Sequence, residues 1–323
     1  MPDQPATDQI NVRSARPEDR DAVVAFCANT WEYGDYIPHV WDAWLRDERG
    51  ALLVAIVGDR PAGVVHIRML SADEAWLEGI RVDPAARRGG IGRVLTSRAL
   101  VTAREHGATV ARLLTGHDNI AAQQLVARFG FTRVAEVVRY QAPALTAGEG
   151  EPDETDEAED TDHIASPHIP PLFHTGPRLM FAGLDDFDRV WEWLEHSNLV
   201  PASGGLEFGN WVARALTEPL LREHLAAGRV WLLEEWEAIQ ALALPADVPA
   251  REDEPSRLHV RYIDGAADGI GRLALVLREE AGLRGHATVD LWLPDLLILR
   301  DAMDGAGYSA GAGGAMWVYA RGL

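Results

Sequence analysis

The stretch Arg87-Arg88-Gly89-Gly90-Ile91-Gly92 decides the fold, because it links a strand-like apolar run to a helix-like segment. The run before it ends at Val82, and the helix-like segment after it continues to His106. Glycine lacks a Cβ atom, so the backbone at Gly90 and Gly92 can approach a bulky phosphate closely. The first amides of a helix have no intrahelical acceptor, and the helix dipole places about half a positive charge at the same end. A strand, a glycine turn and a helix start in this order therefore predict an anion site.

Two well-known phosphate loops do not fit this stretch. A nucleotide P-loop needs Lys followed by Ser or Thr after its last glycine, whereas Gly92 is followed by Arg93-Val94. The dinucleotide fingerprint needs a third glycine and an acidic residue about 20 positions on, and the chain supplies neither. The alternative is an ordinary glycine-rich turn without a ligand. The predicted pyrophosphate ligands are Arg87, Arg88, Gly89, Gly90, Ile91, Gly92 and Arg93.

Two motifs in a fixed order carry a family resemblance. The pattern Arg87-x-x-Gly90-x-Gly92, directly after Val82-Asp83-Pro84, resembles the acyl-CoA pyrophosphate loop of the GNAT (Gcn5-related) N-acetyltransferases. Asn119-x-x-Ala122 and then Gly130-Phe131 follow at the spacing that this family uses for its last helix and strand. The resemblance covers residues 10 to 142 with good motifs and 177 to 323 with poor ones.

The resemblance implies a fold and a cosubstrate. The fold is α/β (α+β), with two tandem GNAT-like domains, each a mixed, mostly antiparallel twisted sheet flanked by helices. The cosubstrate is acetyl-CoA, with no metal. Its pantetheine arm would lie between two diverging strands and pair with backbone groups near Ile80 and Val82, with Asn119 on the other side. The alternative for Asn119 is a helix N-cap without a ligand.

Composition narrows the partners and the compartment. The formal net charge of −20 argues against nucleic acid and favours a cationic or amine-bearing substrate. No run approaches 18 apolar residues, so we expect no membrane partner. The lone Cys27 forms no internal disulfide, and the helical spacing from Val23 predicts that it is buried. We expect a cytoplasmic protein.

The apolar run before the glycine loop offers a candidate base. Period-two alternation along this predicted strand puts Glu74, Trp76, Glu78, Ile80 and Val82 on one face. Acetyl transfer to an amine needs a base for the ammonium proton, and Glu78 is the best placed carboxylate. The alternative is a solvated glutamate or a salt-bridge partner. Together with this strand at 74–82, we expect strands at 10–16, 52–57, 61–70, 109–115 and 133–141, and helices at 19–29, 40–47 and 90–106.

The aromatic stretch from Thr30 to Asp47 is predicted to form the acceptor wall. Gly34 and Pro38 break it, so we expect a loop and then a short helix from Val40. The alternative is that these aromatic residues only cover the core. The predicted substrate contacts are Trp31, Tyr33, Tyr36 and Trp41.

The same stretch carries a finer resemblance. Asp35-Tyr36-Ile37-Pro38 and Trp44-Leu45-Arg46-Asp47 are similar to a segment of the vertebrate histidine N-acetyltransferase group. This resemblance implies a small free amine as acceptor, with an amino acid such as histidine ahead of a polyamine and both ahead of a protein N-terminus.

One departure from the family concerns the general acid. Where the family often has a tyrosine that protonates the leaving thiolate, this chain has Val126. Tyr36 is our choice for a catalytic role beside Glu78. The other candidates for the acid are Tyr33, Tyr140 and His117.

The chain divides into a catalytic GNAT domain at 1–143, an acidic and proline-containing linker at 144–175 and a degenerate GNAT-like domain at 176–323. Residues 149 to 162 hold nine acids and no base, a composition that cannot bury a core. A metal site at His163, His168 and His174 is the less favoured alternative for the histidines that follow.

The second half repeats the first weakly. Gly269 lies 179 residues after Gly90, and Gly307 lies 177 residues after Gly130, which indicates duplication. The two arginines are missing before Gly269, and Asp268 would repel a pyrophosphate. We therefore predict an acetyl-CoA-dependent N-acetyltransferase that acts on the primary amine of a small molecule from its first half. The alternative is a non-catalytic acyl-CoA-binding or interaction protein, and the sequence does not disclose the oligomeric state.

Overall fold

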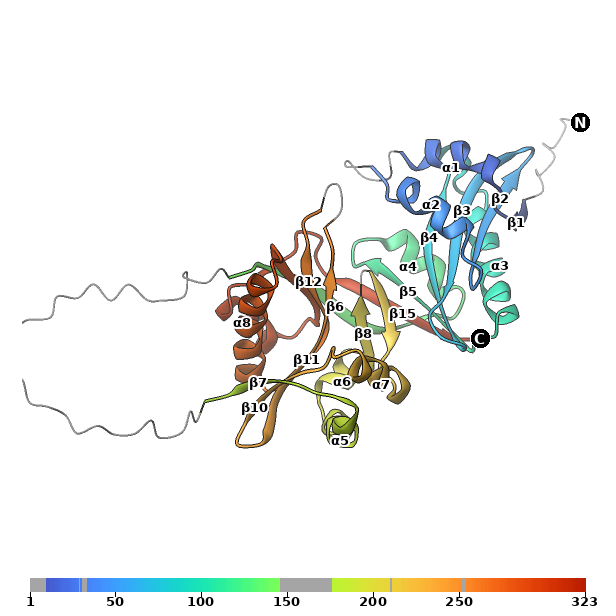
Figure 1. Ribbon diagram of the computed structural model, residues 1–323. Helices are drawn as coiled ribbons and strands as arrows, with labels where there is room; N and C mark the ends of the chain where they lie inside the picture. Colours follow the sequence, from blue (N-terminus) through green and yellow to red (C-terminus); the bar gives the residue numbers. More distant parts are fainter. Residues whose placement is uncertain (1–9, 29, 31–33, 146–175, 210, 251–253) are drawn as a thin grey trace, which may run out of the picture. The chain divides into compact units, whose positions relative to one another are not determined.

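The computed structural model describes residues 10–28, 30, 34–145, 176–209, 211–250 and 254–323 (Figure 1). They divide into two compact units. The first unit takes the described residues within 1–136, 210–214 and 315–323, and the second takes those within 137–209 and 215–314. The chain has a mixed α/β fold, with a large and mostly antiparallel sheet flanked by helices. Within the described residues, no helix has the length and the apolar character needed to cross a bilayer.

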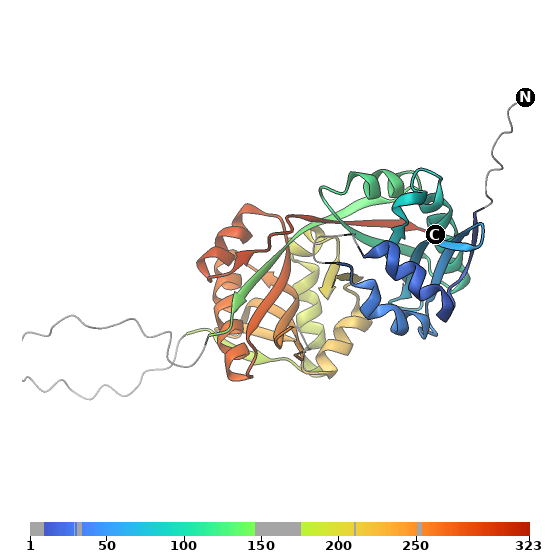
Figure 2. The same cartoon turned by 90° about the horizontal axis from the view of Figure 1, so that it is seen from above.

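The sheet of the first unit grows from antiparallel neighbours. β1, β2, β3 and β4 pair antiparallel in chain order. A short turn at Gly58-Asp59 joins β2 to β3, whereas the segment that carries α1 and α2 joins β1 to β2. β4 then pairs with β5 in parallel after a helical crossover, and the C-terminal strand β15 lies between β5 and β6 (Figure 2). The strands are β1 (Asn11–Ser14), β2 (Ala51–Val57), β3 (Arg60–Met69), β4 (Glu74–Val82), β5 (Val110–Gly116), β6 (Thr132–Pro143) and β15 (Met316–Gly322).

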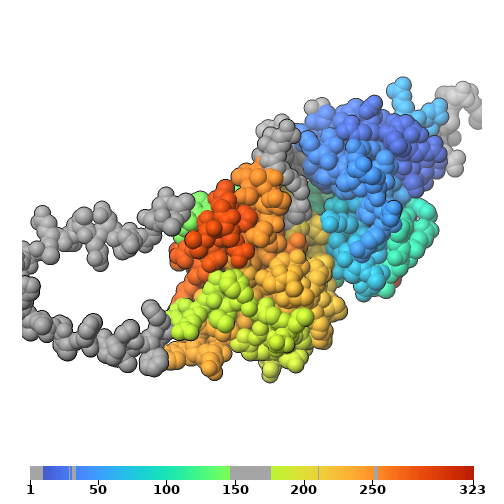
Figure 3. All heavy atoms as spheres, viewed as in Figure 1, coloured from blue at the N-terminus to red at the C-terminus, as the bar shows by residue number. Residues whose placement is uncertain are grey.

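Helices cover both faces of this sheet. On one face, α3 (Ile91–Glu105) and α4 (Ile120–Ala127) contribute to a core that includes Leu95 and Val126. On the other face, α1 (Arg20–Cys27) and α2 (Ile37–Leu45) cover the strands (Figure 1). Figure 3 draws this part of the chain as blue spheres. The short 3-10 turns η1 (Pro17–Asp19) and η2 (Pro84–Ala86) precede α1 and α3. Cys27 is fully buried in the core under α1 and α2, as expected.

The helix expected from Val40 begins earlier, at Ile37. Pro38 lies in the first turn of α2, where its missing N–H is not needed and its fixed φ suits a helix. The prediction that Pro38 breaks this segment was therefore wrong, although Gly34, with φ of +92°, does precede the helix.

The second unit is built on the same plan. Its sheet runs from β6 through β13, β12, β11 and β10 to β7, and β14 also pairs with β6. The strands are β7 (Arg178–Phe181), β8 (Leu206–Gly209), β10 (Trp231–Glu235), β11 (Ala238–Val248), β12 (Arg257–Gly265), β13 (Thr288–Pro294) and β14 (Ser309–Ala310). The short strand β9 (Val212–Ala215) lies mostly in residues assigned to the first unit. The helices are η3 (Leu184–Asp186), α5 (Phe187–Glu195), α6 (Leu199–Ala202), α7 (Glu218–Ala226), α8 (Ala267–Leu283) and α9 (Leu297–Gly305).

Two irregularities occur in both units. The strand before the long helix pairs in parallel with the strand after it over only a few residues, three in β4 and four in β12. The same strand carries a bulge against its antiparallel neighbour, opposite Val64–His66 in the first unit and opposite Ala243–Pro245 in the second.

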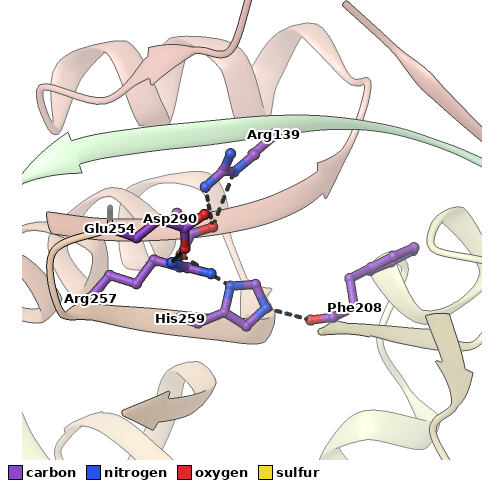
Figure 4. A network of polar contacts seen from close by, with 6 residues as sticks. All are labelled: Arg139, Phe208, Glu254, Arg257, His259 and Asp290. Carbon is purple, nitrogen blue, oxygen red and sulfur yellow. Dashed lines mark hydrogen bonds and ion pairs between the residues drawn. The ribbon is translucent and has the colours of Figure 1, made fainter. Parts of the chain in front are cut away.

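A buried polar network joins strands within the second unit (Figure 4). The carboxylate of Asp290 accepts hydrogen bonds from Arg139 Nη2 at 2.9 Å and from Nε at 3.1 Å, and it lies 3.1 Å from His259 Nδ1. The other ring nitrogen of His259 lies 3.0 Å from the carbonyl oxygen of Phe208. Burial opposes ionisation of Asp290, but the hydrogen bond from His259 and the charges of His259 and Arg139 outweigh it and hold its pKa below the usual range. All of these groups have partners inside the fold, so the network is structural.

Candidate active site

The parallel pairing between β4 and β5 ends early. It comprises Glu74 with Val110, Ala75 with Ala111, and Trp76 with Arg112. Beyond Trp76 the two strands no longer form a ladder, so the backbone groups of β4 that face β5 from Leu77 to Val82 are left without that partner. Unpaired strand backbone is a ready template for another extended chain.

A bulge in β4 lies at the start of this open segment. Val64 pairs with Arg81, but His66 pairs with Glu78, so three steps on β4 match two on β3. Gly79 has φ of +65°, the left-handed conformation that glycine supplies in this type of bulge. A Cβ atom there would also come within 2.7 Å of the ring of Trp44, so only glycine fits.

The bulge changes which side chains share a face. Ile80 and Val82 pack with Leu77 against the core under α3. Glu78 and Arg81 lie on the opposite face, with His66 and Asp35. The expectation that Ile80 and Val82 share a face with Glu78 was therefore wrong, because one extra residue inverts the alternation.

The glycine loop after β4 exposes the start of α3. Arg88 and Gly90 both have left-handed backbone, with φ of +67° and +84°. Gly90 is the N-cap of α3 and offers no side-chain cap, so the amides of Ile91, Gly92 and Arg93 have no acceptor within the helix. A Cβ atom at Gly92 would lie 3.4 Å from its nearest described neighbour, which is ordinary contact. Packing alone therefore does not require a glycine at position 92.

Two arginines of the loop, Arg87 and Arg88, and Arg93 in the first turn of α3 are exposed to solvent. Over the part of the chain that the structure describes, none of the three makes an ion pair. Their charges and the free helix amides together form a site of the right sign for a phosphate group.

Asn119 lies at the start of α4 and caps it. Its Oδ1 accepts a hydrogen bond of 3.1 Å from the amide of Ala122. The cap uses Oδ1 only, and no described residue accepts a hydrogen bond from the side-chain NH2 group. The side chain is exposed, so the cap and a ligand contact are compatible.

Glu78 is held by a histidine on the neighbouring strand. His66 Nδ1 lies 2.8 Å from Glu78 Oε1. The side chain of His66 is 1% exposed, while that of Glu78 is 18% exposed and reaches the surface. Trp44 stacks on the imidazole, with ring centroids 4.6 Å apart and planes 11° from parallel. Glu78 is therefore not freely solvated, and when His66 is protonated their contact is an ion pair, which is the salt-bridge alternative.

An ion pair beside this group fixes the start of α2. Arg81 Nε donates a 2.8 Å hydrogen bond to Asp35 Oδ2, and Asp35 Oδ1 accepts one of 3.1 Å from the amide of Ile37. Tyr36 lies against both elements, with the Arg81 guanidinium 5.5 Å from its ring centroid and Trp44 edge-on at 5.8 Å.

Tyr36 remains protonated over a wide pH range. Its side chain is 40% exposed, and its ring contacts Arg81 and Trp44. Desolvation raises the pKa of Tyr36 to about 12, and the opposing charge of Arg81 does not cancel this effect. A neutral phenol at this position can donate a proton or a hydrogen bond.

The other predicted site residues lie in different settings. Trp31 and Tyr33 lie outside the described residues. Trp41 is fully buried in the core, so Trp44 is the aromatic residue of α2 that contacts Tyr36 and His66.

The remaining candidates for the general acid, His117 and Tyr140, have different surroundings. His117 contacts the carbonyl oxygen of Ala315 through both its amide and Nδ1, each at 3.1 Å. Tyr140 belongs to the second unit. Val126 is buried in the core under α3, where the family often has its tyrosine.

Sequence reasoning missed the partners of Glu78. His66 is a lone histidine in an apolar strand, and its relation to Glu78 depends on a register that the bulge shifts. Gly79 was the available signal, because a glycine inside a strand pattern often marks a bulge.

The match to a known protein family lies in the first unit. Residues 20–131 match the family model described as the acetyltransferase (GNAT) family. The chain is also similar to a mycothiol acetyltransferase from Salinispora tropica, with 30% identity over 156 residues, 44% of this chain and 50% of that protein. The chain thus spans about half the length of this curated relative.

Solved structures match nearly the whole chain. A GCN5-related N-acetyltransferase from Sphaerobacter thermophilus has a TM-score of 0.58 at 14% identity, over 97% of this chain and 95% of that one. The GCN5-related glucosamine N-acetyltransferase region of a fungal multi-domain β-N-acetylglucosaminidase has a TM-score of 0.61 at 14% identity, over 99% of this chain and 39% of that one. At these identities, the likeness shows the fold alone.

Proposed function

Because residues 20–131 match the acetyltransferase (GNAT) family model, we propose that this chain is an acetyl-CoA-dependent N-acetyltransferase whose acceptor is the primary amine of a small molecule. The observation that carries the proposal is the construction of β4. One strand holds Glu78 on its acceptor face, leaves its edge toward β5 unpaired and runs directly into the glycine loop. A base, a template for an extended chain and a phosphate site thus follow one another within a few residues.

The cosubstrate fits the residues on the β5 side of β4. The amides of Ile91, Gly92 and Arg93 suit a pyrophosphate, and Arg87 and Arg88 add charge-assisted hydrogen bonds of about 1.5–3 kcal/mol each. The backbone of β4 near Ile80 and Val82 can pair with the amide groups of a pantetheine arm. Acetyl-CoA supplies an activated acyl group, since a thiol is a good leaving group.

The residues on the opposite face can perform the proton chemistry. An amine is protonated near neutral pH and must lose a proton before its nitrogen attacks a carbonyl carbon. Glu78 is a carboxylate on this face that reaches the surface, and His66 holds it by a 2.8 Å contact. As the new N–C bond forms and the C–S bond breaks, the departing sulfur takes up a proton. Tyr36, whose hydroxyl stays protonated, is the described residue best suited to supply it.

The acceptor is assigned only as a class. Trp44 and Tyr36 form an aromatic wall beside Glu78, and the formal net charge of −20 favours a cationic molecule. A small free amine therefore ranks ahead of a protein N-terminus, with an amino acid such as histidine ahead of a polyamine. The similarity to a protein named as a mycothiol acetyltransferase adds an amine precursor of mycothiol to the candidates.

The second unit is proposed to be a degenerate copy that holds no acetyl-CoA. The shared bulge and the short parallel pairing support duplication. At its bulge, β12 carries Val260, Arg261 and Tyr262, none of which is a carboxylate. α8 begins at Ala267, two residues after β12 ends, with Asp268 in its first turn and no arginine pair before it.

The test is a panel of acceptors. Purified protein is incubated with acetyl-CoA and free histidine, other amino acids, spermidine, an aminoglycoside, a mycothiol precursor or a peptide with a free N-terminus, and thiol release is followed. We expect turnover with at least one small amine. Activity with the peptide alone would refute the small-molecule assignment, and acetyl-CoA binding without turnover would favour the non-catalytic alternative.

A further inference from the structure

An arginine lies beside the proposed base on the acceptor face of β4. The bulge sets their spacing, because Glu78 pairs with His66 while Arg81 pairs with Val64, two residues away along β3. Two residues of a strand span about 7 Å, so the backbones at Glu78 and Arg81 are about that far apart. In a regular strand, residues three positions apart lie on opposite faces. The bulge therefore brings a carboxylate and a guanidinium to the same face.

The fold holds this guanidinium from the buried side. Arg81 Nε donates a 2.8 Å hydrogen bond to Asp35 Oδ2, and Nη1 donates one of 3.1 Å to the carbonyl oxygen of Ile80. The other oxygen of Asp35 accepts a hydrogen bond from the amide of Ile37. The side chain of Asp35 is 0% exposed, whereas that of Arg81 is 18% exposed. A molecule that arrives from solvent therefore meets Arg81 before it meets Asp35.

Tyr36 lies close to both charged groups of this face. The guanidinium of Arg81 is 5.5 Å from the centroid of its ring. Desolvation is the main cause of the raised pKa of Tyr36, and after it the charge of Arg81 lowers this pKa and the charge of Glu78 raises it. A carboxylate, a phenol and a guanidinium thus line one small region of the surface.

The two charges of this region match the two ends of an α-amino acid. One carbon atom separates the ammonium group of such a molecule from its carboxylate. An amino acid with a charge-assisted hydrogen bond of about 2.8 Å at each end bridges two side chains that start about 7 Å apart. The planar fork of a guanidinium suits a carboxylate in particular. A polyamine would instead bring a second positive charge toward Arg81.

We propose that Arg81 binds the carboxylate of a free α-amino acid whose amine lies at Glu78, and this inference rests on the proposed function. Arg81 is then a specificity-determining residue. The acidic chain attracts cationic molecules in general, and Arg81 selects among them the amines that carry a neighbouring carboxylate. The alternative is an ion pair with Asp35 that only joins the start of α2 to β4. A structural ion pair would not distinguish acceptors that differ in this one group.

The experiment compares acceptors with and without the carboxylate. We measure kcat and KM for free histidine against histamine, and for free arginine against agmatine. Loss of Arg81 alone would leave Asp35 buried without its cation, so the variant combines Arg81→Gln with Asp35→Asn. Asparagine keeps a side-chain oxygen for the amide of Ile37. We expect the preference for the amino acid to fall by about 10–100-fold, mainly through KM, with only a small change for the decarboxylated amine.

The matched control is an ion pair of the same kind on the edge strand. Arg13 donates hydrogen bonds of 2.7 and 2.8 Å to the two oxygens of Asp19, whose side chain is 4% exposed. β2 and β3 separate this strand, β1, from β4. Arg13→Gln with Asp19→Asn should lower the melting temperature and leave the preference among acceptors unchanged. Since each protein is tested with the same acceptors, differences in amine basicity cancel.

The outcomes separate the inference from the proposed function. Native activity that is equal with and without the carboxylate, or confined to amines that lack one, overturns the inference and leaves the proposed function standing. A preference that survives in the folded double variant, or that falls equally in the control, also overturns it. If the double variant does not fold, as judged by its melting curve and acetyl-CoA binding, Arg81→Lys decides.

Lysine keeps a charge for Asp35 but lacks the planar fork of arginine. We therefore expect Arg81→Lys to lower the preference several fold, and an unchanged preference would overturn the inference. Absence of native turnover with every amine overturns both the proposed function and this inference.

Discussion

The substitution Gly92→Glu separates the phosphate site from the fold. Gly92 lies in the first turn of α3, and its amide is among those without an intrahelical acceptor. A Cβ atom there would meet Leu125 Cδ2 at 3.4 Å and Val82 Cγ2 at 3.8 Å, so the fold has room for a side chain. Acidic residues in the first turn of a helix are favoured by about 0.3–1 kcal/mol. The variant should therefore fold as well as the native protein or slightly better.

Binding of acetyl-CoA should respond in the opposite direction. The new carboxylate would lie where a pyrophosphate is expected, and two like charges about 4 Å apart repel by about 4 kcal/mol at the effective dielectric of a protein surface. A lost charge-assisted hydrogen bond adds about 1.5–3 kcal/mol, although the two effects overlap. A net loss of about 3–4 kcal/mol is a weakening of Kd of about 10²–10³-fold.

Calorimetric titration with acetyl-CoA, together with a melting curve, measures both effects. The matched control is Gly271→Glu in α8, where a Cβ atom would likewise make ordinary contact, at 3.6 Å from the carbonyl oxygen of Ala302. We expect the control to bind acetyl-CoA as the native protein does. An unchanged Kd in a folded Gly92→Glu variant would refute the assignment of the glycine loop as the pyrophosphate site.

Four further outcomes follow from the geometry. Glu78→Gln should lower kcat by about 10²–10³-fold with little change in acetyl-CoA binding, and an unaltered pH profile would make Glu78 structural. A titration should give one acetyl-CoA per chain, and density for CoA beside Asp268 would contradict this. Absorbance titration of the native protein against Tyr36→Phe should reveal a phenol that ionises near pH 12. Because folding raises this pKa, the stability that it contributes below pH 10 is lost as the pH rises through about 12. A midpoint near pH 10 would contradict the desolvation of Tyr36. Gly79→Ala should lower the stability by about 1–3 kcal/mol, because it strains the bulge and displaces Trp44, and an unchanged melting curve would count against the bulge.

The local elements of the site could be predicted from the sequence. The bounds of β4 and the start of α3 follow from the apolar run and the glycine loop, and both agree with the structure to within one residue. Such signals are local, because a strand edge and a helix cap depend on neighbouring residues.

The pairing of distant segments could not be predicted. The bulge at Gly79 decides whether Ile80 or Arg81 joins Glu78, and no count of alternating residues reveals the extra position. The contact of His66 with Glu78 depends on that same register. The place of β15 beside β5 is likewise a long-range pairing, for which the sequence carries no local signal.

The central claim is acetyl transfer to nitrogen at the first unit, and mass spectrometry of the reaction products tests it most directly. Native protein, Glu78→Gln and Gly92→Glu are incubated with acetyl-CoA and the best acceptor of the panel, and the mass and fragmentation of the acceptor are recorded. We predict an acceptor that gains one acetyl group on its amine with native protein, and far less with either variant. An acceptor that stays unmodified, or that is acetylated equally by all three proteins, would contradict the claim.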